Sequence, residues 1–287
     1  MLVEGYSLTA IKGLERKTLP ESSLKDLRFW TPAARAALNL FSRYYFDSVT
    51  IQGSLPNPAD NRGIIIAGNH PSNATVLPLV TNLLENAQKM PDKFVRKQRM
   101  PHMLAKEEFF NGITGMILRS TGQIPVNRSN GVKSLKQATA ILKQGGLVGI
   151  YPEGTVTKDP NGWPTPVTEA QQLEYKLRGL EEGSQEYTEV CSTVKNYGFD
   201  GRYRLGAAWL AETTNAIIVP TLTYVDRDGP GANLTIQFDN PMPGQDLSTR
   251  QKQREFTAQM MLNIAEMMAI MKDEPLPPEI RSSILKF

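Results

Sequence analysis

The chain has 287 residues, of which 40% are hydrophobic and 21% are charged, and its formal net charge is +3. This composition is that of a folded protein with a large core. The small positive charge suits an anionic membrane surface but is far below that of a nucleic-acid-binding protein, so we expect no nucleic-acid partner. The single cysteine, Cys191, excludes an internal disulfide and a cysteine-rich metal site. We expect neither a metal ion nor a cofactor.

Residues 1–46 predict an N-terminal helical segment, whose main helix covers residues 24–46. This stretch has no glycine, and its one proline, Pro32, would kink or restart the helix. Its aromatic and basic side chains leave two interpretations open: a helix packed on the core, or an interfacial helix with aromatic anchors and a basic face. Because the sequence shows no secretory signal and no run of about 20 apolar residues, we expect a cytoplasmic protein that binds the inner face of the cell membrane peripherally.

From residue 47 onward, short apolar runs alternate with helical patterns. The helix predicted for residues 130–144 is the clearest, because its apolar residues share one face and Gly145 follows it. Strands that alternate with helices build a mostly parallel sheet. The sequence therefore predicts one α/β domain over residues 47–287, with helices flanking a largely parallel central sheet. The predicted strands are 48–51, 63–67, 102–106, 122–126, 146–150, 216–224 and 233–238.

Two further stretches complete the predicted organisation. The sequence Ser248-Thr249-Arg250-Gln251 indicates a capping box at the start of the last long helix. The methionines from Met260 to Met271 are predicted to fill the core. Residues 165–200 interrupt the alternation with a polar stretch, which we interpret as a helical insertion over the site or on the surface.

Polar clusters follow three of the predicted strands. His70 lies in the sequence GNHPSNATV directly after Ile64–Ala67, where a histidine is a natural general base, although a lone histidine is also common as a structural residue. Arg128 follows the strand Gln123–Val126, and PEGT follows the strand that ends at Tyr151. The ends of parallel strands share one edge of a sheet, so these clusters can converge there. Arginine together with backbone amides freed by glycine suits a phosphate group.

The order and spacing of these motifs resemble those of the glycerolipid acyltransferases, the lysophosphatidate and glycerol-3-phosphate acyltransferases. That family carries the ordered motifs NH-x4-D, G-x-I-x-x-x-R, P-E-G-T and I-V-P. They correspond here to Asn69-His70, Gly122 to Arg128, Pro152 to Thr155, and Ile218 to Pro220. The match covers roughly residues 45–240 and implies a single domain of the glycerolipid acyltransferase type.

One position departs from the family pattern. The aspartate that falls five residues after the histidine, and that orients its imidazole in the family, is Thr75 in this chain. Three explanations remain open. Asn73 or Thr75 accepts the hydrogen bond from Nδ1, an acid such as Glu107 or Glu108 reaches in from elsewhere, or the protein is inactive.

The resemblance implies transfer of a fatty acyl group to the hydroxyl of a lysophospholipid such as 1-acylglycerol-3-phosphate. His70, supported by Asn73 and Thr75, would remove the hydroxyl proton, and the oxygen would attack the thioester of acyl-CoA or acyl-carrier protein. The other histidine, His102, is expected to be structural. The residues expected to hold the acceptor phosphate are Arg128, Glu153, Gly154, Thr155 and Lys158.

The main alternative is a catalytically silent member of the family that binds lipid or an acyl carrier. The absent aspartate favours this alternative, whereas the retention of His70, Arg128 and Glu153 argues against it. A serine hydrolase is disfavoured because the sequence contains no G-x-S-x-G elbow.

Overall fold

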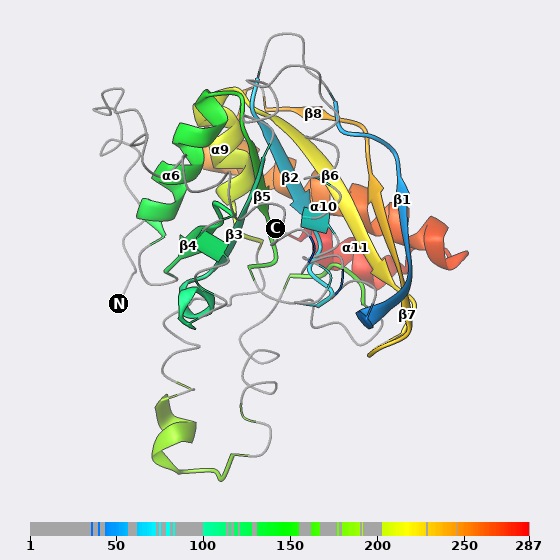
Figure 1. The fold of residues 1–287 in the computed structure, drawn as a ribbon. Coiled ribbons are helices and arrows are strands. Elements are labelled where there is room, and N and C mark those ends of the chain that lie inside the picture. Colours follow the sequence, from blue (N-terminus) through cyan, green and yellow to red (C-terminus); the bar gives the residue numbers. More distant parts are fainter. Residues whose placement is uncertain are drawn as a thin grey trace.

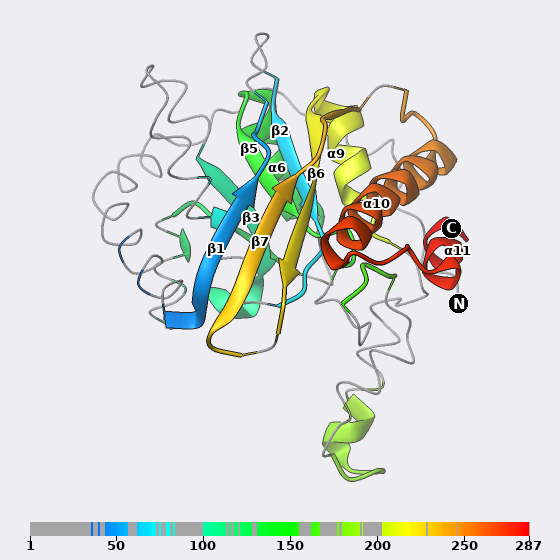
Figure 2. The same ribbon diagram turned by 90° about the vertical axis from the view of Figure 1, so that its right-hand side faces the viewer.

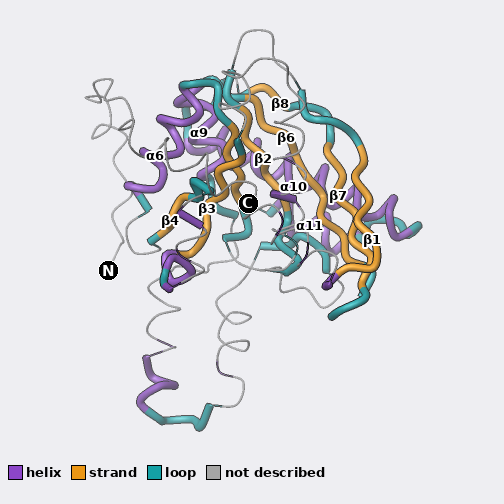
Figure 3. Tube along the Cα trace, in the orientation of Figure 1, coloured by secondary structure: helices purple, strands orange, loops and turns teal. Residues whose placement is uncertain are grey.

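The computed structural model describes most of the predicted domain (Figure 3, coloured segments). Most of the predicted helix over 24–46 and much of the predicted insertion over 165–200 lie outside the described residues. The described residues of that helix, 36, 40, 44 and 45, are helical, but Phe46 already belongs to the first strand. The described residues are 36, 40, 44–56, 62–72, 75, 79–80, 83, 100–112, 115, 118–119, 121–127, 131–154, 162–166, 177, 180–189, 191, 203–227, 229–244 and 246–286.

In the described part of the chain, an eight-stranded sheet forms the centre of the domain (Figure 1). The strand order is β1-β7-β6-β2-β5-β3-β4, and β8 pairs with β6 outside this path. All seven predicted strands are confirmed, while β8 was missed because two residues are too short to give a periodic signal. The strands are β1 (Phe46–Gln52), β2 (Ile64–Gly68), β3 (Pro101–Lys106), β4 (Ile124–Val126), β5 (Leu147–Ile150), β6 (Ile217–Val225), β7 (Ala232–Phe238) and β8 (Met242–Pro243).

The sheet is largely parallel, as predicted. Strands β6, β2, β5, β3 and β4 pair in parallel with one another. Strands β7 and β8 run antiparallel to β6, and β1 runs parallel to β7. The carboxyl ends of the five parallel strands therefore lie at one edge of the sheet, and those of β1 and β7 point the other way.

Helices pack on one face of this sheet and a separate apolar cluster covers the other. Figure 2 shows α9, α10 and α11 on the same side of the strands. Their apolar side chains, with those of α6, form one core cluster with Ile65 and Ala67 of β2. The alternate residues Ile64 and Ile66 pack instead with Leu83 and its neighbours on the opposite face. Burial on both faces explains why β2 is a continuous apolar run. The helices are α6 (Val132–Lys143), α9 (Gly206–Thr214), α10 (Arg250–Lys272) and α11 (Pro278–Leu285), with a 3₁₀ helix, η2, at Glu107–Phe110.

Helix α6 confirms the prediction made for residues 130–144. Its buried residues include Ala138, Ile141 and Leu142. The helix ends in a Schellman motif, in which Gly145 takes a φ of 78° and donates to Leu142 O at 2.9 Å. Gly146 completes the motif by donating to Ile141 O at 2.9 Å.

The predicted capping box at the start of α10 is wrong by one residue. The N-cap is Thr249, whose hydroxyl accepts from Lys252 N at 3.2 Å. The side chain of Ser248 instead hydrogen bonds to Asp246, where it helps Lys252 to lower the pKa of that carboxyl group. Because the residue three positions after Thr249 is a lysine, the reciprocal bond of a capping box cannot form. The predicted role of the methionines is confirmed, since Met260, Met261, Met267 and Met268 are buried.

Pro220 lies within a central strand without breaking a ladder. It pairs with Ala67 of β2 on one side. On its other side, β6 changes partner from β8, which pairs at Ile217 and Ile218, to β7, which pairs from Thr221 onward. The carbonyl of Pro220 accepts from Asp239 N at 2.9 Å on that side. The nitrogen of Pro220 points to the same side, between the residues of β6 that pair with β8 and those that pair with β7. A proline can occupy this position because no ladder donor is required there.

No helix within the described ranges is long and apolar enough to cross a membrane. The longest described stretch of the predicted insertion, residues 180–189, lies away from the sheet at the edge that carries the carboxyl ends of the parallel strands (Figure 1).

Candidate active site

The carboxyl ends of β2 and β5 bring His70 and Glu153 together. These strands are adjacent and parallel, with Ala67 paired to Ile150. The chain leaves β2 at Gly68 and β5 at Ile150, and both exits lie at the same edge of the sheet. The predicted convergence of the first and third motifs is therefore present in the structure.

Asn69, the residue directly before His70, is hydrogen bonded through its side chain to the neighbouring strand β6. Its Nδ2 donates to Thr223 O at 2.9 Å, and its Oδ1 accepts from Thr223 N at 2.8 Å. The side chain is fully buried. Its amide thus continues the ladder between β2 and β6 beyond the end of β2. This pair of bonds fixes the position of the backbone that leads into His70.

His70 is held by two further contacts from the end of β5. Its main-chain N–H donates to Oε1 of Glu153 at 2.9 Å. Its ring is stacked on that of Tyr151, with the centroids 4.2 Å apart and the planes inclined by 17°. The imidazole is half-buried, so it is oriented by its neighbours and still accessible to a substrate.

Glu153 is a buried carboxylate, with 2% of its surface exposed. Burial is the main cause that raises the pKa of Tyr151 above its usual range, and the negative charge of Glu153 raises it further. The same two causes, in the same order, raise the pKa of Tyr203. The hydroxyl of Tyr203 donates to the carbonyl of Pro164. Both phenols are thus neutral at ordinary pH and neither is a candidate base.

Thr75 occupies a buried turn close to His70 in the sequence. Its hydroxyl donates to Ser72 O at 2.8 Å. A hydroxyl that donates one hydrogen bond can still accept another. The expectation that Thr75 accepts a bond from the imidazole stays a prediction.

Gly154 allows an arginine to lie across the turn after β5. Gly154 has a φ of 72°, and its N–H donates to Tyr151 O at 2.9 Å. A Cβ atom at this position would lie 3.1 Å from Cγ of Arg204 and 3.3 Å from its Nε. The main-chain N–H of Arg204 donates to Pro152 O at 2.6 Å. Glycine therefore serves both the backbone conformation and the close approach of Arg204.

The remaining expected site residues are either exposed at the same edge of the sheet or outside the described residues. Glu107 and Glu108 lie in η2 at the end of β3, at the same edge of the sheet, and both are exposed. The expected roles in catalysis and in phosphate binding stay predictions for every residue named above. Those that lie outside the described residues are Asn73, Arg128, Thr155 and Lys158.

His102 has the contacts of a structural residue. Its Nδ1 lies 2.6 Å from Gly122 O. Because a carbonyl oxygen can only accept, Nδ1 carries the proton. Burial lowers the pKa of this imidazole, and the bond to Gly122 opposes that effect in part.

Sequence reasoning missed three contributors to the site. Asn69 was recognised only as part of a motif, and Tyr151 only as the end of a strand. Arg204 was not selected, although it lies in the sequence YRLGAAWL that precedes the fourth motif. For Tyr151, its position directly before the P-E-G-T motif was a signal that could have identified it. The bonds of Asn69 and Arg204 left no such signal in the sequence, because they connect distant segments.

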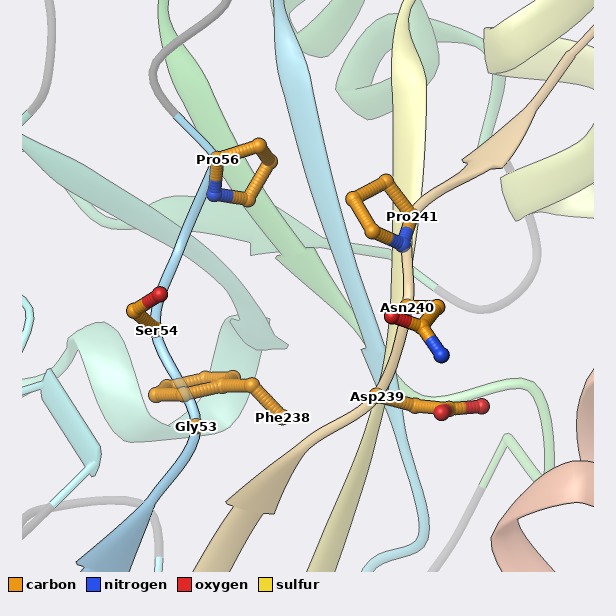
Figure 4. A pocket seen from close by; sticks show the side chains of 7 residues that line it. All are labelled: Gly53, Ser54, Pro56, Phe238, Asp239, Asn240 and Pro241. Atoms are coloured by element: carbon orange, nitrogen blue, oxygen red, sulfur yellow. The ribbon is translucent and has the colours of Figure 1, made fainter.

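A separate depression of about 380 Å³ lies beside the carboxyl ends of β1 and β7 (Figure 4). Its lining includes Gly53, Phe238 and Asp239. The polar atoms of Asp239 serve the fold, since its N–H donates to Pro220 O and its carboxylate accepts from Asn263 at 3.3 Å. Because β1 and β7 run opposite to β2, this depression belongs to a different part of the molecule from His70.

Residues 48–223, more than half of the chain, match the sequence model of a family described as Acyltransferase. This span begins in β1, ends in β6, and contains all four motifs together with Arg204.

Two known proteins are similar to the chain over different extents. The 1-acyl-sn-glycerol-3-phosphate acyltransferase of Bacillus subtilis (strain 168) is 33% identical over 103 residues, which are 36% of this chain and 45% of that protein. The match thus spans less than half of the length of that relative. The 1-acyl-sn-glycerophosphate (LPA) acyltransferase PlsC from Thermotoga maritima gives a TM-score of 0.48 at 15% identity, over 87% of this chain and 88% of that one.

Proposed function

Since the chain belongs to the acyltransferase family, we propose that it moves a fatty acyl group from acyl-CoA or acyl-carrier protein to the hydroxyl of a lysophospholipid. The acceptor class is suggested by the printed name of the Bacillus subtilis relative, a 1-acyl-sn-glycerol-3-phosphate acyltransferase. The observation that carries the proposal is the fixed position of His70, whose main chain is bound by Glu153 and whose ring is stacked on Tyr151.

In the proposed reaction, His70 removes the proton from the acceptor hydroxyl, and the oxygen attacks the carbonyl carbon of the thioester. Backbone amides stabilise the oxyanion that forms. The bond between carbon and sulfur then breaks, and the proton passes from the imidazolium to the leaving thiolate. The products are a carboxylic ester of the acceptor and a free thiol, so no acyl-enzyme is needed.

A thiol-release assay on the purified protein tests this proposal. The donors are acyl-CoA and acyl-carrier protein, and the acceptors are lysophosphatidate, other lysophospholipids and glycerol-3-phosphate. We expect release that depends on a lysophospholipid. Equal release without any acceptor would indicate a hydrolase, and no release with any acceptor would favour the silent binding protein that the threonine at position 75 suggests.

The phosphate of the acceptor would be bound by arginine. We retain Arg128 in this role and add Arg204, because its side chain lies across Gly154, the residue that follows Glu153. A guanidinium is always charged and binds phosphate in bidentate geometry.

Arg128→Ala and Arg204→Ala should each raise the acceptor KM by about tenfold or more, with a smaller effect on kcat, since the bond is made before the chemical step. Arg281→Ala is the matched control, because that arginine pairs with Glu266 on the surface. Steady-state kinetics with varied acceptor measure the effect. A change confined to the KM of the acyl donor would contradict the assignment.

A lipid acceptor has to reach the His70 edge from a membrane, and exposed apolar side chains lie at this edge. Phe109 is in η2 after β3. Tyr44 precedes β1, which begins beside the start of β7, and the start of β7 pairs with the end of β6. Both are exposed, as is Leu40. Aromatic side chains of this kind enter the interface of a bilayer without spanning it.

We therefore predict peripheral binding to anionic vesicles, strongest at low salt. Removal of residues 1–45, which stops before β1, should release the protein from the vesicles in a sedimentation assay. Circular dichroism verifies that the truncated protein is folded. A folded truncation that binds as well as the full chain would show that the N-terminal segment packs on the core instead.

A further inference from the structure

A buried acid lies next to His70 although the family's aspartate is absent. Position 75 is a threonine, whose hydroxyl donates to Ser72 O. Glu153 reaches His70 from the neighbouring strand and accepts its main-chain N–H at 2.9 Å. A hydrogen bond from a backbone N–H favours the ionised form of the carboxyl group that accepts it. In its ionised form, this carboxylate therefore puts its negative charge at the main chain of the proposed base.

The distance from this charge to the imidazole is limited by covalent geometry. Within one histidine, the main-chain nitrogen and Nδ1 are separated by four bonds and lie at most about 5 Å apart. Oε1 of Glu153 is 2.9 Å from that nitrogen. The carboxylate oxygen is thus at most about 8 Å from Nδ1 in any rotamer, and a charge at this range acts strongly when water is excluded from the space between them.

The charge of Glu153 is also close enough to act on two neighbouring phenols. It raises the pKa of Tyr151, after the larger effect of burial, and the ring of Tyr151 is the one stacked on His70. It also raises the pKa of Tyr203 in the same way. A field that disfavours a negative phenolate beside the imidazole favours a positive imidazolium in the same place.

The contacts of Asn69 and Tyr151 beside His70 are neutral, whereas the cationic side chain of Arg204 lies across Gly154, the residue after Glu153. Asn69 uses its amide on the backbone of Thr223. Tyr151 offers an aromatic face, which adds a favourable contact for a cation. Among the contacts described for His70, the one made by an acidic side chain is that of Glu153.

We propose that Glu153 replaces the missing aspartate electrostatically and stabilises the protonated form of His70 through its charge. Glu153 is then a positioning residue that acts through His70, in place of the expected contact with the acceptor phosphate. This proposal rests on the proposed function in one respect, since it takes His70 as the base.

A titration of His70 by NMR tests the proposal without any substrate. The full chain contains two histidines, so the ring Cε1–H signals of His70 and His102 can be assigned by substitution. Glu153→Gln retains an oxygen that can accept the N–H of His70 but removes the charge. Glu212→Gln is the matched control, because Glu212 likewise accepts a main-chain N–H, from Leu247 at 2.9 Å, but lies on α9.

We expect Glu153→Gln to lower the pKa of His70 by about one or more. Glu212→Gln should leave the pKa of His70 where it is in the wild-type protein. The double variant Glu153→Gln with Thr75→Asp should recover at least half of the loss, because it returns a carboxylate to the family's position. An unchanged pKa in Glu153→Gln would overturn the proposal, and a double variant that stays at the lowered value would overturn the equivalence of the two positions.

The wild-type protein provides a second measurement that does not depend on the folding of a variant. Burial lowers the pKa of an imidazole, and we expect the charge of Glu153 to outweigh this effect, so that the pKa of His70 lies above the value of about 6.5 that a free histidine side chain shows. A lower value would overturn the proposal. The titration involves no acyl transfer, so it tests the role of Glu153 separately from the proposed function. It can contradict that role while the thiol-release assay supports acyl transfer, or support the role while the assay detects no transfer.

Discussion

Replacement of His70 by alanine should abolish acyl transfer and leave the fold intact. General-base catalysis contributes about 10² to 10⁴ to the rate, and both neighbouring phenols have pKa values raised by burial and by Glu153. The bonds of Asn69 to Thr223 do not involve the imidazole, so the end of β2 should stay in place. The thiol-release assay measures the rate, and circular dichroism verifies the fold.

His102→Asn is the matched control for this variant. The amide nitrogen of asparagine can take the position of Nδ1 and donate to Gly122 O, so the contact that His102 makes is retained. We expect a rate within about threefold of the wild type. A His70→Ala variant that keeps more than about a tenth of the wild-type rate would remove His70 from the mechanism.

Replacement of Asn69 by alanine should have the largest effect on stability. It leaves both the N–H and the C=O of Thr223 without their partner, in a residue that is itself buried. Each buried polar group left unsatisfied costs about 1–3 kcal/mol. We therefore expect the free energy of unfolding to fall by about 2–4 kcal/mol. The variant should also lose activity, because the main chain of His70 follows directly.

Urea unfolding followed by circular dichroism measures this loss. Asn233→Ala is the control, because Asn233 is exposed and hydrogen bonds to Asp226 at the surface. We expect its cost to be below about 1 kcal/mol. If both asparagine variants cost the same, the amide of Asn69 does not anchor the end of β2.

The sequence was informative where one segment determines its own structure. Ile64–Ala67 form a continuous apolar run because both faces of β2 are covered, and this run identified the strand directly. The end of α6 was predictable because Gly145 and Gly146 supply the local bonds of a Schellman motif. Motifs that follow parallel strands meet at one edge, so the proximity of His70 and Glu153 also followed from the pattern of elements.

The contacts that orient His70 could not be predicted because they connect distant segments. Asn69 and Thr223 are 154 positions apart, and His70 and Glu153 are 83 apart. No periodic pattern encodes which oxygen a given N–H will meet. The error at α10 has a different origin. Ser248 and Thr249 can both cap a helix, and the bond of Ser248 to Asp246 decides between them only in the folded protein.

The most direct test of the proposed function is identification of the product by mass spectrometry. Purified wild-type protein and His70→Ala are incubated with 1-acylglycerol-3-phosphate and either acyl-CoA or acyl-carrier protein. We predict that the wild-type protein forms the acceptor extended by one acyl chain, in equal amount to the free thiol released, and that His70→Ala forms none. Free fatty acid in place of the extended lipid, or the same product from both proteins, would contradict the account.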